Sequence, residues 1–156
     1  MPYSTQITTY PPNHPNPSRV IEILIDGQPW GQPGDANFRF GNRICRMLLS
    51  CKPILKTFLE TEGANPEQHN KTFQGNQWLP VSISVEGFSK FERQHNGEEI
   101  NRPYLKFSCN ESTPIGIGWK KAEGLIAVWG QLEAFATEVG MPPIGAPANI
   151  QDIFGV

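Results

Sequence analysis

Two different spacings of apolar residues follow one another along the chain, and together they limit the folds that it can adopt. Residues 40–59 and 122–139 carry apolar side chains three and four positions apart, which is typical of helices with one buried face. Residues 81–86 and 102–109 alternate apolar with polar side chains, which is typical of half-buried strands, and residues 20–26 predict a further strand with Ile21, Ile23 and Ile25 on its core face. The order β-α-β-β-α predicts an α+β fold, with an antiparallel sheet of three or more strands and two helices packed on one face.

The ends of both helices are marked by residues that cap or break helical backbone. We expect the first helix to begin at Asp35, a good N-cap residue, and to end at Gly63. Pro53 lies inside this stretch. Because proline removes one hydrogen bond and clashes one turn back, we expect a kink or two separate helices there. The second helix should span 119–139 and stop at Gly140.

The turn between the second and third strands is predicted at Asn96-Gly97, a strong signal for a two-residue hairpin turn. Such a turn would place Val85 opposite Ser108, so that an apolar residue would face a polar one. One inserted residue repairs this mismatch, and we place that bulge at Gly87.

Three segments differ in composition, although the length of 156 residues is that of one domain. Residues 1–18 contain five prolines and almost no aliphatic side chains, so we expect an extended or disordered arm. Residues 19–140 should form the α+β domain, in which 64–77 is a polar excursion. Residues 141–156 form an apolar tail rich in proline and glycine. We find no internal repeat.

Composition and targeting signals favour a cytoplasmic protein without a membrane partner. No apolar run is long enough to span a bilayer, and the N-terminal residues lack the pattern of a secretory signal. Cys45, Cys51 and Cys109 are widely spaced and have no histidine at ligand distance, which favours buried thiols over a metal site. We therefore expect neither a metal nor another cofactor.

Catalytic residue types are sparse, so we expect a protein that is not an enzyme. The chain has three histidines, and they lie in polar, turn-rich stretches. Acid–base catalysis needs a base oriented by a further group. A catalytic interpretation would gain support if His69 or His95 lay in a pocket beside Glu86 or Glu92.

The net charge of −2 conceals two basic segments. Residues 36–59 carry five cations and no acid, and residues 101–121 carry four cations and one acid. In the first segment Arg39, Arg43 and Arg46 are spaced four and three apart, which would align three guanidinium groups outside the apolar stripe. Guanidinium groups fit phosphate oxygens, although an ordinary solvated helix face would have the same spacing.

The open face of the predicted sheet provides a second basic surface. Arg102, Tyr104 and Lys106 should point away from the core, since the residues between them are apolar. With the bulge at Gly87, Phe91 and Arg93 lie beside Tyr104. Without the bulge their places are taken by Phe88 and Lys90. Rings that stack on bases, next to cations that hold phosphates, are typical of single-stranded nucleic-acid binding. A solvated face, or one covered by 64–77, is the alternative.

A glycine-containing turn leads into the second helix. Gly116 and Gly118 let the backbone approach a ligand, and Lys120 and Lys121 lie beside the helix N-terminus, which favours anions. The segment lacks the full glycine pattern of a dinucleotide fold and is not a P-loop, so no nucleotide cofactor is expected. A tight turn that needs glycine is the alternative.

Small residues lie close together on the second helix: Gly124, Ala127, Gly130 and Ala134. Glycine inside a helix costs about 1 kcal/mol relative to alanine, so another element should approach the helix there. That element is either the first helix or a second subunit.

Residues 81–139 resemble small single-stranded-DNA-binding folds of the Whirly and positive-cofactor kind. The resemblance lies in the strand alternation and in the run Ile-Gly-Trp-Lys-Lys-Ala that ends at Ala122. It implies a curved sheet with basic and aromatic residues, followed by a glycine-containing turn and a C-terminal helix.

These features predict a small non-enzymatic nucleic-acid-binding or accessory protein that binds single-stranded DNA or RNA. The residues expected to contact the strand are Arg39, Arg43, Arg46, Phe91, Arg93, Arg102, Tyr104, Lys106, Lys120 and Lys121. The alternative is a structural or assembly protein, for example a virion component, whose arms bind neighbouring subunits. In that case residues 141–156 would contact a second copy or another protein.

Overall fold

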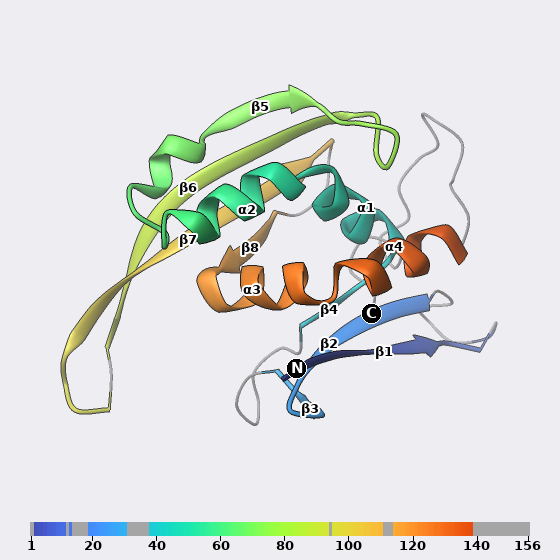
Figure 1. Ribbon diagram of the computed structural model, residues 1–156, viewed down its shortest axis with the longest axis horizontal. Coiled ribbons are helices and arrows are strands. Elements are labelled where there is room, and N and C mark those ends of the chain that lie inside the picture. The colour runs from blue at the N-terminus through green and yellow to red at the C-terminus, as the bar shows by residue number, and fades with distance from the viewer. Residues whose placement is uncertain are drawn as a thin grey trace.

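The computed structural model describes residues 2–11, 13, 19–30, 38–93, 95–110 and 114–138. Four strands, two helices and a 3-10 helix are followed by four more strands and two more helices (Figure 1). The elements are β1 (Tyr3–Thr9), β2 (Arg19–Ile25), β3 (Gln28–Pro29), β4 (Arg39–Phe40), α1 (Asn42–Ser50), α2 (Lys52–Glu60), η1 (Pro66–His69), β5 (Lys71–Gln74), β6 (Ser82–Arg93), β7 (Glu99–Cys109), β8 (Ile115–Gly118), α3 (Trp119–Ala127) and α4 (Trp129–Glu138).

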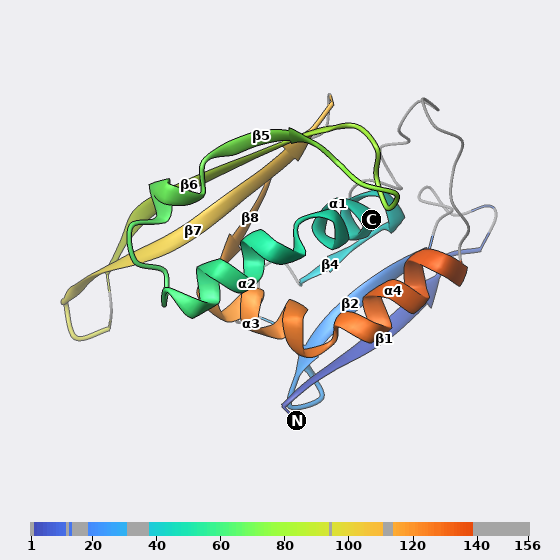
Figure 2. The same cartoon turned by 45° about the horizontal axis from the view of Figure 1, so that its top comes forward.

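The strands form two antiparallel sheets, and the helices lie between them (Figures 1 and 2). In the first sheet β2 pairs with β1, β3 and β4, and the second sheet has the order β5-β6-β7-β8. The α+β class predicted from the sequence is confirmed. The predicted order β-α-β-β-α, with two helices on one face of one sheet, is too simple: a second sheet covers the helices from the other side.

The core is one continuous layer to which both sheets and all four helices contribute. Its fully buried larger side chains are Ile21, Ile23, Phe40, Met47, Leu48, Leu55, Phe58, Ile83, Leu105, Phe107, Ile117 and Phe135. Burying apolar area is the main favourable term in folding, so the sheets and helices stabilise each other through this layer. No helix in the described part of the chain is long and apolar enough to cross a membrane.

The elements β4-α1-α2 and β8-α3-α4 have the same order and the same local structure. A short strand is followed by a glycine N-cap with extended backbone, at φ −87° for Gly41 and −81° for Gly118. A nine-residue helix follows, one residue interrupts it, and a second helix completes the pair. At matching positions in the two pairs the same buried residues occur: Leu48 and Leu125, Leu55 and Leu132, Phe58 and Phe135.

The two helix pairs pack against each other in a reciprocal way, α1 on α4 and α2 on α3. If α1 corresponds to α3 and α2 to α4, this pattern is what an approximate two-fold axis between the pairs would produce. The structure thus contains a repeat that the sequence analysis did not find. The two helix pairs share few identical residues, and these are too few to reveal the repeat in the sequence.

The helices differ from those predicted in two ways, and the expected break at Pro53 is present. Asp35 lies outside the described residues, and α1 begins only at Asn42, because Phe40 belongs to strand β4. The expected effect of Pro53 is confirmed, since it lies in the first turn of α2, where proline needs no hydrogen-bond partner. The second helix is also broken, at Val128, which no proline or glycine at that position marks.

The β6–β7 hairpin has no bulge. Arg93 pairs with Glu99, so the loop holds five residues instead of two, and Val85 pairs with Phe107. Gly87 pairs directly with Leu105, so it does not form a bulge. Glycine is needed at this position because η1 lies very close to it. A Cβ atom there would lie 1.7 Å from the carbonyl oxygen of Pro66 in η1.

Besides the two-residue strands β3 and β4, three strands lie where no strand was expected. Tyr3–Thr9, which falls in the expected arm, pairs with β2 along its whole length. Lys71–Gln74 lies in the polar stretch and pairs with the edge of β6. Ile115–Gly118 pairs with β7. The tail 141–156 lies outside the described residues.

We expect Gly87→Ala to destabilise the fold, because its methyl group would meet the η1 backbone, which cannot rotate away as a side chain can. The expected loss is about 2–3 kcal/mol of unfolding free energy in urea titrations. Gly116→Ala on β8 is the matched control, since no atom lies within 4 Å of the place that its methyl group would take. Equal stability of the two variants would contradict the close contact between η1 and β6.

We expect the fold to lose stability as the pH falls below 6.5, the ordinary pKa of histidine. His69 packs edge-on against Phe58 with a centroid distance of 5.7 Å, and burial lowers its pKa. The unfolded chain therefore binds a proton at His69 more readily than the folded protein, so acid favours unfolding. Urea titrations between pH 7 and 5 should show this loss reduced in His69→Gln and retained in His95→Gln. Identical pH dependence in all three proteins would contradict it.

Candidate nucleic-acid interface

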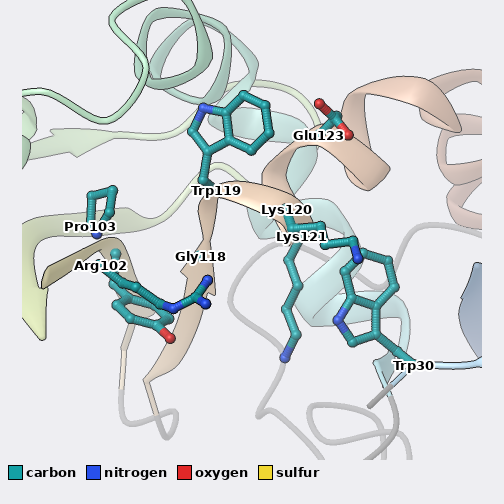
Figure 3. Close-up of a pocket in the computed structure, with 9 residues that line it drawn as sticks. Trp30, Arg102, Pro103, Gly118, Trp119, Lys120, Lys121 and Glu123 are labelled. Atoms are coloured by element: carbon teal, nitrogen blue, oxygen red, sulfur yellow. The ribbon is translucent and has the colours of Figure 1, made fainter. Parts of the chain in front are cut away.

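A cleft of about 500 Å³ lies where β7, β8 and the start of α3 meet the residue that follows β3 (Figure 3). This volume is within the range that holds small ligands. The lining residues are Trp30, Arg102, Pro103, Tyr104, Gly118, Trp119, Lys120, Lys121 and Glu123. Four of the residues predicted from the sequence are therefore brought together: Arg102, Tyr104, Lys120 and Lys121.

Three cations from two elements face this cleft. Arg102 is on β7, and Lys120 and Lys121 are in the first turn of α3. Figure 3 shows the side chain of Lys121 running toward Trp30, while the indole of Trp119 points away from both lysines. The ammonium group of Lys121 lies 5.0 Å from the ring centroid of Phe38, and burial lowers its pKa.

Trp30 forms the aromatic wall of the cleft, and a tight turn places it there. β2 and β3 are joined through Asp26 and Gly27, which have φ values of +51° and +76°. This is the backbone of a type I′ hairpin turn, for which Asp-Gly is a favoured pair. The indole stacks on Tyr3 at 5.9 Å with the planes 17° apart, and it meets Phe38 edge-on at 5.5 Å.

A hydrogen bond connects this aromatic wall to helix α3. The hydroxyl of Tyr3 donates to Oε1 of Glu123 at 2.6 Å. Burial, followed by the hydrogen bond to Glu123 and its charge, raises the pKa of Tyr3 to about 12. The hydroxyl therefore remains protonated at neutral pH and holds β1 beside the helix that carries Lys120 and Lys121.

The open face of β6 and β7 extends the cleft with a second pair of stacked rings. Phe88 lies opposite Tyr104, with centroids 5.7 Å apart and planes 19° apart. Lys90 lies opposite Arg102 on the same face. Lys106 is also on this face, but its ammonium group is paired with Oε2 of Glu86 at 3.2 Å.

Phe91 and Arg93 do not lie beside Tyr104. Because the hairpin has no bulge, Phe88 pairs with Tyr104 and the odd-numbered residues of β6 occupy the opposite face. Phe91 is 70% exposed there, and Arg93 forms an exposed ion pair with Glu99. The register therefore selects Phe88 and Lys90, the neighbours expected in the absence of a bulge.

The three arginines expected along the first helix do not form one exposed ridge. Arg46 is 3% exposed, and its Nε donates to the carbonyl oxygen of Trp78. Arg39 is half-buried in strand β4, opposite Glu22. Arg43 is half-buried in α1. The predicted alignment of three guanidinium groups outside the apolar stripe is therefore wrong, because Arg39 precedes the helix and Arg46 is buried against the segment around Trp78.

Trp30 is a member of the cleft that the sequence patterns did not single out. It lies in residues 27–34, where the density of proline and glycine predicts a loop. The signal that could have placed it was Asp26-Gly27, a hairpin pair that returns the chain along β2. The pairing with Tyr3 could not have been found, since it needs β1 beside β2.

The residues considered for metal binding or catalysis lie elsewhere. Among the described residues no three histidine, cysteine or acidic side chains are grouped as metal ligands would be. Cys45, Cys51 and Cys109 are buried free thiols. His69 is buried against Phe58, His95 lies exposed in the hairpin loop, and the carboxylate of Glu86 pairs with Lys106.

No protein-family model matches the chain, and no curated protein or solved structure shows significant similarity to it. The resemblance of residues 81–139 to single-stranded-DNA-binding folds therefore stays a resemblance. The order that it implies is present only in part in β6 to α4, because the glycine-containing segment before the helix is strand β8 and not a turn.

Proposed function

We propose that this protein binds single-stranded nucleic acid and acts without catalysis. One observation carries the proposal: Arg102, Lys120 and Lys121 line the same cleft as Trp30 and Tyr104. Cations hold phosphate oxygens, and aromatic rings stack on bases whatever their identity. The combination within one concave site is what distinguishes this surface from an ordinary solvated sheet face.

The geometry favours a single strand over a duplex. In a duplex the bases are stacked on one another, so their faces cannot lie on protein rings. A single strand can place bases on the rings of the cleft and its phosphates beside the cations. The stacked pair Phe88–Tyr104 and the cations Lys90 and Arg102 extend this surface along β6 and β7.

The overall charge of −2 is compatible with this partner, because the cations are locally concentrated. Exposed charges further apart than about 8–10 Å are largely screened at physiological salt. A phosphate in the cleft therefore interacts mainly with the charges that line it, three cations (Arg102, Lys120 and Lys121) against the one carboxylate of Glu123, and much less with distant acidic residues.

We expect a fluorescently labelled single strand of about 20 nucleotides to bind, with an affinity that falls steeply between 50 and 200 mM salt. Lys120→Ala should weaken binding roughly 5- to 10-fold at 50 mM salt and reduce the salt slope by about 0.7, the value for one lost phosphate contact on a single strand. Fluorescence anisotropy measures both quantities.

The matched control is Lys56→Ala, which removes another exposed lysine, from α2. It should leave affinity and salt slope close to those of the unchanged protein. Absence of binding at 50 mM salt would overturn the proposal, and so would equal losses in the two lysine variants, since that would indicate dependence on net charge alone.

A further inference from the structure

We propose that the cleft is a base-binding subsite, in which one nucleobase of the bound strand stacks on the indole of Trp30. This inference rests on the proposed function and deepens it. It assigns separate tasks to the lining residues: Trp30 recognises a base as a flat ring, whereas Lys120 and Lys121 hold the adjoining phosphate.

Trp30 is a preformed platform. Its ring is stacked on Tyr3 and meets Phe38 edge-on, so its orientation is set by packing on two sides. Tyr3 in turn is held by its hydrogen bond to Glu123. The indole nevertheless lines the cleft and is only partly buried. A ring that is already ordered loses little conformational entropy when a base stacks on it.

Helix α3 approaches this ring closely at Gly124. A Cβ atom on Gly124 would lie 3.3 Å from the Trp30 indole and 3.2 Å from the Tyr3 ring. The close approach expected at Gly124 is thus confirmed, but the approaching element is the first sheet and not the first helix or a second subunit, and Gly130 has no such neighbour. Glycine at position 124 lets both rings lie directly against the helix that carries Lys120 and Lys121.

Positive charge lies next to the ring. The ammonium group of Lys121 lies over Phe38, whose ring is itself edge-on to Trp30. Lys120 precedes it on the helix and is exposed. A phosphate beside these ammonium groups would bring the attached base within reach of the indole. Because stacking requires only a flat ring, the subsite should accept any of the bases.

The decisive experiment compares two labelled single strands of equal length, one with bases and one built only from abasic residues with the same phosphates. Trp30→Ala should bind the base-bearing strand about 5- to 100-fold more weakly than the unchanged protein, the range expected for one lost stacking contact. It should bind the abasic strand within twofold of the unchanged protein. Trp30→Phe, which keeps a ring, should recover part of the loss.

A second pair of variants tests the platform without changing any cation or ring. Gly124→Ala should displace Trp30 and Tyr3 and weaken binding of the base-bearing strand, while the abasic strand is bound as before. Gly130→Ala is the matched control, since no atom lies within 4 Å of the added methyl group. Circular dichroism melting checks that both variants are folded.

The outcomes separate this inference from the proposed function. If the unchanged protein binds neither strand at 50 mM salt, both proposals are overturned. If it binds the base-bearing strand but Trp30→Ala and Gly124→Ala bind equally well, only the base-binding subsite is overturned. The subsite is also overturned if Trp30→Ala weakens both strands by the same factor, because the loss would then not depend on a base.

Discussion

The packing of α1–α2 against α3–α4 is the interaction on which the rest of the structure depends. Each sheet uses one apolar face, and this helix layer covers both of those faces. The contact is mainly apolar, with Leu55 and Phe58 in one pair and Leu132 and Phe135 in the other. Two polar contacts accompany it: Cys45 Sγ lies 3.4 Å from the carbonyl oxygen of Leu132, and Asn42 Nδ2 lies 3.4 Å from that of Ala136.

The same layer explains how the cleft is assembled. Strand β8 leads through Gly118 directly into α3, so the sheet that carries Arg102 and Tyr104 is joined to the lysines of the first helical turn. The first sheet packs against α3 at Gly124 and brings Trp30 to the same place. The aromatic wall comes from the first sheet, whereas the basic wall comes from β7 and α3, and the two meet because α3 follows the second sheet directly and packs against the first.

Particular residues show how far the sequence could predict the fold and the site. The alternation of apolar and polar residues in 102–109 correctly predicted that Leu105 and Phe107 point into the core and that Arg102 and Tyr104 point away from it. Successive side chains of a strand lie on opposite faces of the sheet, so this pattern can be read from the sequence. The choice between Phe91 and Phe88 depended on whether the hairpin loop held two or five residues, and Asn96-Gly97 is compatible with either. Arg46 lies in the core because a neighbouring layer covers its face of the helix, which no local pattern reports.

The sequence by itself determined the α+β class, the apolar stripes of both helix pairs, the break at Pro53 and the position of Lys120 and Lys121 at the start of a helix. These features depend on local backbone preferences and on the spacing of apolar residues. Only the tertiary structure decided the second sheet, the strand register, the repeated helix pairs and the meeting of Trp30 with the basic residues. Those depend on contacts between residues far apart in the chain, where packing of complementary surfaces, rather than local preference, selects the partners.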